Sequence, residues 1–160
     1  MKILDGQALL AESGLDSFKA GSTFGALSDE AIRFLLGRGR VVSLVEGEDL
    51  FHPDDAGDSF FVVLQGQIDY LRDGVLVRTV AFGEQLGYVS MIGLFRHIGA
   101  GKAHGPTLVL EVSSDLFYQL HLEFPSDFGI VVLNLSRDMA RALRKLGGDL
   151  VEASTGHSSS

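Results

Sequence analysis

The run over residues 83–92, Gly-Glu-Gln-Leu-Gly-Tyr-Val-Ser-Met-Ile, contains residue types that can bind an anion through the backbone. Gly83 and Gly87 allow a tight turn, because glycine accepts backbone angles that other residues avoid. A short helix is predicted after Gly87, and the first N–H groups of a helix have no partner within it. Such free N–H groups suit phosphate oxygens, and an arginine can add a bidentate contact. The run is therefore a candidate anion-binding site.

The chain offers little for metal or nucleophilic chemistry. No His-x-His or His-x-x-x-His pair, which would be typical of a metal site, is formed by the histidines. Four of the five histidines precede residue 149, and they are His52, His97, His104 and His121. No Ser-His-Asp order or nucleophile elbow indicates acyl transfer. We expect no catalytic residue and no bound metal, and a metal-dependent enzyme on a small barrel ranks third among the interpretations.

Length and composition favour one domain. With 160 residues, 46% of them hydrophobic, the chain can form one core but not two ordinary domains. The net charge of -8 argues against a nucleic-acid partner, because phosphate contacts need clustered Lys and Arg. The absence of cysteine excludes disulfides and cysteine-ligated iron–sulfur clusters. No segment is apolar over the length of a membrane span, so we expect a cytoplasmic protein without a membrane partner.

The elements that would position the candidate site are short and separated by turns. Ser28 can cap a helix over residues 29–36. Strands are predicted at 41–45, 60–64, 67–71, 75–80 and 108–112. Ser113 or Ser114 then caps a second short helix, which ends before Pro125. Regular spacing of this kind favours an antiparallel sandwich or barrel over a parallel sheet.

A helical apolar stripe follows over residues 130–146. Its members recur at alternating steps of three and four residues, as in a heptad seam: Val132, Leu135, Met139, Ala142 and Leu146. The stripe either pairs two protomers or packs onto the sheets of its own domain, and about two heptads do not decide between these alternatives. We expect Gly147 and Gly148 to end the helix, and residues 149–160 to form a disordered tail.

The segment from Gly47 to Tyr70 carries a family resemblance. The sequences Gly47-Glu48-Asp49-Leu50-Phe51 and 55–70, with glycines at turn or bulge positions, resemble the cyclic-nucleotide-binding domain superfamily of catabolite-activator type. The resemblance implies a mainly β fold with flanking helices: an antiparallel jelly-roll-like β-roll with N-terminal helices and a long C-terminal helix. It divides the chain into an N-terminal segment at 1–23, the β-roll at 24–124, the helix at 125–148 and the tail at 149–160, without a DNA-binding domain.

The resemblance also identifies the ligand cassette. In the family it has the form Gly-x-x-Phe/Leu-Gly-Glu-x-Ala/Ser, followed about ten residues later by Arg and Ser/Thr-Ala. It assigns ligand binding to Gly87, Tyr88, Val89, Ser90, Arg96 and His97. Tyr88 replaces the ribose-binding glutamate, and Arg96 or His97 would contact the phosphate, while the Ser/Thr-Ala is absent. A second register, which places Phe82-Gly83-Glu84 on the Phe-Gly-Glu motif, ranks lower because it lengthens the gap to the next basic residue.

These observations predict a non-enzymatic sensor or regulatory module. It would bind cyclic AMP, cyclic GMP or a related small anion weakly, because the phenol of Tyr88 brings no charge to the ribose site. Occupancy would change how the C-terminal helix packs. The alternative is a pseudo-receptor, the same fold with an unused pocket, acting as a dimerisation or protein-interaction module. We expect a homodimer through the C-terminal stripe and an unidentified protein partner.

Overall fold

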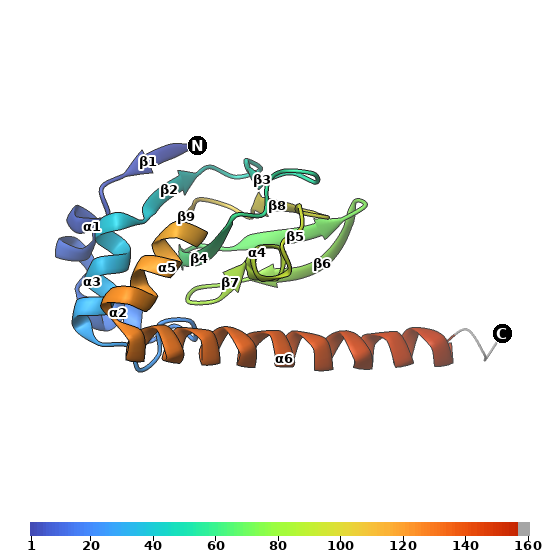
Figure 1. The fold of residues 1–160 in the computed structure, drawn as a ribbon. Helices are drawn as coiled ribbons and strands as arrows, with labels where there is room; N and C mark the ends of the chain where they lie inside the picture. Colours follow the sequence, from blue (N-terminus) through green and yellow to red (C-terminus); the bar gives the residue numbers. More distant parts are fainter. Residues whose placement is uncertain (157–160) are drawn as a thin grey trace.

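Two antiparallel sheets form the centre of the computed structural model, which describes residues 1–156 (Figure 1). Their strands are β1 Lys2–Leu4, β2 Arg40–Leu44, β3 Asp49–Phe51, β4 Ser59–Gln65, β5 Ile68–Arg72, β6 Val75–Val80, β7 Gln85–Leu86, β8 Ala100–Ala103 and β9 Thr107–Ser113. One sheet has the order β1-β2-β9-β4-β7, and the other has the order β3-β8-β5-β6. The predicted antiparallel β-roll is confirmed, and the sequence missed only short strands such as β1, which pairs with β2.

Strand β4 lies between two apolar clusters. Because successive side chains of a strand point to opposite faces, Phe60, Val62 and Leu64 join the cluster on the helical side. Phe61 and Val63 join the cluster between the two sheets. Both faces of β4 are therefore buried, which explains why its sequence is a continuous apolar run without alternation.

Short helices gather at one end of the sheets (Figure 1). They are α1 Gly6–Ser13, α2 Leu15–Lys19, α3 Asp29–Arg38 and α5 Ser114–Glu123. The hydroxyl of Ser28 accepts a hydrogen bond from the N–H of Ala31 at 3.2 Å, and Ser113 accepts one from Leu116 at 3.1 Å. Both predicted caps are confirmed, with Ser113 rather than Ser114 at the second position.

The last helix, α6 (Pro125–Gly156), passes along the sheets toward the C-terminus (Figure 1). The prediction that Gly147 and Gly148 end this helix was wrong, and the predicted tail is helical through Gly156. Each interior glycine costs about 1 kcal/mol relative to alanine, but extending an existing helix needs no new nucleus. An ion pair of 2.9 Å between Lys145 Nζ and Asp149 Oδ2 spans the glycines. Residues 157–160 lie outside the described residues.

The apolar stripe of α6 has two different surroundings. Leu135 is 0% exposed inside the core cluster of its own chain, and Val132 and Met139 pack against the same cluster. The predicted place of Leu135 in a dimer seam is therefore wrong, because the helix turns this side chain toward its own domain. Ala142 and Leu146, further along the helix, line a pocket.

Candidate functional site

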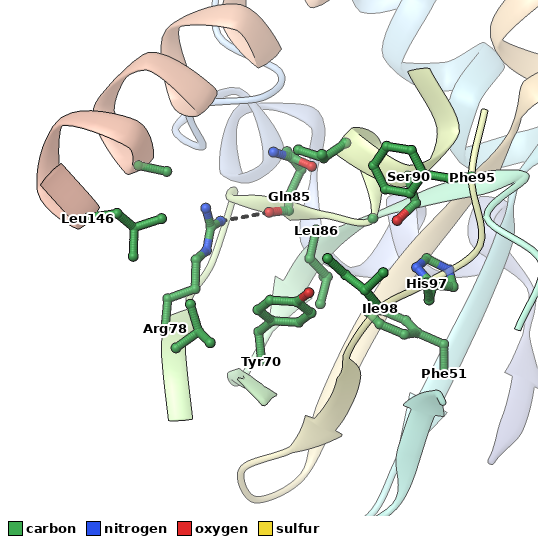
Figure 2. A pocket seen from close by; sticks show the side chains of 14 residues that line it. Phe51, Tyr70, Arg78, Gln85, Leu86, Ser90, Phe95, His97, Ile98 and Leu146 are labelled. Atoms are coloured by element: carbon green, nitrogen blue, oxygen red, sulfur yellow. Dashed lines mark hydrogen bonds between the residues drawn. The ribbon is translucent and has the colours of Figure 1, made fainter. Parts of the chain in front are cut away.

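A pocket of about 210 Å³ lies between the β-roll and α6 (Figure 2). Strands β5, β6 and β7, the short helix α4 (Tyr88–Gly93) and the loop after it contribute most of its wall. Ala142 and Leu146 of α6 complete it. Most lining side chains are apolar or aromatic: Phe51, Tyr70, Val77, Leu86, Val89, Phe95 and Ile98.

Part of the predicted ligand cassette lines this pocket. Gly87, Val89, Ser90 and His97 all contribute to the wall. Gly87 adopts a left-handed conformation with φ of 86° at the position that opens α4, so the predicted turn into a short helix is confirmed. The sequence therefore located the pocket, although the binding of a ligand there stays a prediction.

His97 is a buried pocket residue whose ring stacks on Phe51. The two ring centroids are 4.0 Å apart with an angle of 16° between the planes. The backbone N–H of His97 donates to the carbonyl of Asp55 at 3.0 Å, which fixes the loop. Burial lowers the pKa of His97 below its ordinary value of 6.5, although Asp55 and Asp58 act in the opposite direction. The imidazole is therefore mostly neutral near pH 7 and is a poor partner for a phosphate.

Tyr88 lies in the core instead of the pocket wall. Its ring packs edge-on against Phe60, with centroids 5.7 Å apart, and against Phe117 at 6.2 Å. The residue is 3% exposed, and burial raises the pKa of its phenol. Tyr88 therefore does not occupy the position at the pocket that the cassette alignment assigned to a ribose contact.

Arg96 also lies outside the pocket wall. Its guanidinium donates to the backbone carbonyl of Asp54 at 2.7 Å, and the residue is exposed. The guanidinium thus stabilises a surface turn, and it is not among the groups that line the pocket.

A polar cluster that the sequence analysis missed joins the pocket to α6. The side-chain amide of Gln85 donates to Asp138 Oδ2 at 2.7 Å. Arg78 donates to the backbone carbonyl of Gln85 at 2.8 Å (Figure 2). Arg78 also lies 3.6 Å from the carboxylate of Asp138. Only the approach of α6 to β7 brings these residues together, so no local sequence signal could have found them.

The amide oxygen of Gln85 has no hydrogen-bond partner among the described residues. Gln85 is 3% exposed, so water does not reach this oxygen freely. A buried acceptor without a partner costs about 1–3 kcal/mol. One polar atom of this cluster is therefore buried with its hydrogen-bonding capacity unused.

The pocket holds little net charge. Arg78 is the lining residue with a permanent positive charge, and Asp138 lies next to it.

Within residues 1–156, the histidines and acidic residues form no group that could hold a metal ion. None of the helices in this part of the chain combines the length and the apolar character that a membrane crossing requires.

Comparison with protein families identifies the class. A family model described as the cyclic nucleotide-binding domain matches residues 41–124, more than half of the chain. The protein therefore belongs to the cyclic nucleotide-binding domain family. This assignment agrees with the β-roll, the α4 turn and the long helix that follows the sheets.

Solved structures share this fold. A cyclic nucleotide-binding domain from Methylobacillus flagellatus KT is 22% identical and has a TM-score of 0.81, with 95% of this chain and 88% of that chain covered. The N-terminal domain of a transcriptional regulator from Streptomyces coelicolor A3(2) is 28% identical with a TM-score of 0.63, and 82% and 94% of the two chains are covered.

Curated relatives match over about half of the chain. The cAMP-dependent protein kinase regulatory subunit of Yarrowia lipolytica is 30% identical over 81 residues, which are 51% of this chain and 22% of the relative. An uncharacterized protein of Mycobacterium tuberculosis is 27% identical over 78 residues, 49% of this chain and 16% of that protein. The chain thus spans less than a quarter of the length of these relatives.

Proposed function

We propose that the protein is a non-enzymatic regulatory module that reports the occupancy of its pocket through α6. The observation that carries the proposal is that Ala142 and Leu146 of α6 form part of the pocket wall, together with Val89 and Ile98 of the β-roll. A bound molecule contacts both parts, so its presence shifts the equilibrium between different positions of the helix. The similarity to a kinase regulatory subunit supports a regulatory role.

Cyclic AMP and cyclic GMP are proposed as weak ligands. A cyclic phosphate needs a charged partner, but Arg78 is already compensated by Asp138, and the pKa of His97 is lowered by burial. Tyr88 and Arg96 lie away from the wall. The loss of one charge-assisted hydrogen bond costs about 1.5–3 kcal/mol, or about ten- to a hundredfold in affinity. Binding of either nucleotide should therefore be weak or absent.

Calorimetric titration and hydrogen exchange test this function. We expect dissociation constants for cyclic AMP and cyclic GMP well above about 1 µM. At millimolar nucleotide, exchange of the α6 amides near Ala142 should slow, while the amides of α1, which lies among the short helices, should exchange unchanged. A submicromolar dissociation constant would contradict weak binding, and occupancy without any change in α6 would contradict the regulatory coupling.

A second candidate function is a ligand-free dimerisation or protein-interaction module. The observation that favours it is the apolar surface on the C-terminal half of α6, where Leu143, Leu150 and Val151 are 73%, 68% and 63% exposed. We propose that this surface forms a homodimer and that the unidentified protein partner contacts the dimer. If this candidate function is correct, no small molecule should change the hydrogen-exchange rates of the α6 amides. A cytoplasmic location stays a prediction, which cell fractionation tests.

A further inference from the structure

The imidazole of His97 is an almost fully buried polar group on the wall of the pocket. His97 is 4% exposed, and it lines the pocket together with Ser90 and Phe95 (Figure 2). No hydrogen bond among the described residues involves the ring. Its nitrogens are nevertheless not closed off from water, since Gln85 Oε1 is the buried side-chain polar atom without a partner in this part of the chain. The small exposed part of His97 therefore includes its ring nitrogens, which can form a hydrogen bond with a molecule from solvent.

Contacts on several sides hold this ring in place. It stacks on Phe51 with ring centroids 4.0 Å apart. A Cβ atom on Gly87 would lie 3.4 Å from Cε1 of His97, so the ring lies beside the start of α4. The N–H of His97 donates to the carbonyl of Asp55 at 3.0 Å, and its carbonyl accepts from the N–H of Asp54 at 2.7 Å. The imidazole therefore has little freedom to leave the pocket wall when its charge changes.

Few charges act on the imidazole of His97. In the loop before β4, Asp55 and Asp58 favour its charged form, but burial has the larger effect and keeps its pKa below 6.5. The neighbouring Arg96 donates to the backbone carbonyl of Asp54. The contacts of the ring with β3 and α4 are with uncharged residues. A proton on His97 thus creates a cation that the protein compensates incompletely.

We propose that protonation of His97 makes the binding of an anionic ligand in the pocket depend on pH. The proposal rests on the proposed function and adds a regulation of the same site. While His97 is neutral, the pocket wall offers an anion little attraction, because Arg78 is paired with Asp138. Once His97 is charged, an oxygen of the anion accepts a charge-assisted hydrogen bond and acts as the counterion of the imidazole. The affinity for an anion should therefore rise as the pH falls.

Calorimetric titration of the full chain with cyclic AMP at two pH values tests the proposal. We expect cyclic AMP to bind about tenfold more tightly at about pH 5.5 than at about pH 8, the effect of one hydrogen bond to a charged group. Adenosine, which has no phosphate, should show no such increase. In His97→Gln, whose side chain does not titrate, the increase for cyclic AMP should disappear.

His104→Gln is the matched control, since His104 is exposed and is not among the residues that line the pocket. It should keep the same increase in affinity as the parent. If circular dichroism shows that His97→Gln is not fully folded, His97→Phe takes its place, because it keeps an aromatic ring against Phe51 and lacks the titrating nitrogens. The same loss of pH dependence is expected.

An NMR titration of the imidazoles gives a result that a purely structural role of His97 would not produce. If a proton on His97 strengthens binding of the anion, the bound anion must favour that proton by the same factor. Cyclic AMP should therefore raise the pKa of His97 and leave the pKa of His104 unchanged.

The outcomes separate this proposal from the proposed function. The proposal is overturned by an affinity for cyclic AMP that is equal at the two pH values, by the same increase in His97→Gln or with adenosine, or by no binding at millimolar cyclic AMP at either pH. The proposed function fails on a different result, namely unchanged exchange of the α6 amides while cyclic AMP is bound. An increase that requires His97, together with slower exchange in α6, supports both.

Discussion

The pKa values of His97 and His104 are shifted in opposite directions, because the two histidines have different surroundings in the β-roll. His97 is buried against Phe51, and desolvation lowers its pKa. His104 is exposed, and its Nδ1 lies 2.9 Å from Asp69 Oδ2, a contact that raises its pKa. Burial favours the neutral imidazole, whereas a neighbouring carboxylate favours the charged one.

Titration of the two imidazoles by NMR should therefore separate them. We expect the pKa of His97 below its ordinary 6.5 and that of His104 above it. His97 stabilises the fold above about pH 6.5, and this contribution is lost as the pH falls, because the unfolded chain then binds the proton more readily. The contribution of His104 is present below about pH 6.5 and is lost as the pH rises through its raised pKa.

Asp69→Asn is the control for this titration. It should return the pKa of His104 toward the ordinary value and leave that of His97 unchanged, since Asp69 is the first cause of the His104 shift only. A pKa of His97 at or above 6.5 would contradict burial as the dominant influence on this imidazole, since Asp55 and Asp58 act in the opposite direction.

Tyr88 provides a second prediction for a single residue. In the cassette alignment, Tyr88→Glu restores the ribose-binding carboxylate, but the ring lies in the core at 3% exposure. We expect Tyr88→Glu to destabilise the protein by about 3 kcal/mol or more, because it buries a carboxylate without a partner. Tyr88→Phe should stay within about 1 kcal/mol of the parent. Urea unfolding measures both, and tighter cyclic AMP binding by a stable Tyr88→Glu would argue against the core placement.

At the scale of the elements, the two halves of the helix α6 differ in how far their apolar side chains are buried. Its first half is part of the core, with Val131 at 1% and Leu135 at 0% exposure. Its second half carries Leu143 and Leu150, which are mostly exposed, on the same continuous backbone. The pocket lies beside the middle of the helix, where Ala142 and Leu146 contribute to its wall.

The difference between the two halves predicts that a leucine-to-alanine substitution lowers the unfolding free energy more in the first half of α6 than in the second. Leu135→Ala should cost about 2–5 kcal/mol of unfolding free energy, because it leaves a cavity in the core. Leu143→Ala should change the unfolding free energy of the monomer by less than about 0.5 kcal/mol. Denaturant unfolding at low protein concentration gives both values, and similar losses for the two variants would refute the division.

At the scale of the whole molecule, the question is what covers the end of α6. Leu143, Leu146 and Leu150 recur at steps of three and four residues, and they are 73%, 47% and 68% exposed. Soluble proteins usually cover a contiguous apolar surface of this kind with a partner. A two-fold pair of identical helices is the commonest closed arrangement.

We therefore predict a homodimer at about ten micromolar and above, which the double substitution Leu143→Asp and Leu150→Asp converts to a folded monomer. Light scattering gives the mass, and circular dichroism confirms the fold. Leu122→Asp, at an exposed position of α5, is the control and should leave the mass unchanged. A parent that is monomeric at this concentration would rule out the dimer.

The sequence by itself determined the fold class and the longer strands, but not the short strands or the end of α6. The caps at Ser28 and Ser113 depend on neighbouring residues and were predictable. The tertiary structure alone decided that Leu135 faces its own core and that Gln85 meets Asp138, 53 residues away. Local patterns indicate which segments become helices and strands, because caps, turns and the spacing of apolar residues involve only near neighbours in the sequence. The face that a helix presents, and the polar groups that it brings to a pocket, depend on packing between distant segments, which no local spacing records.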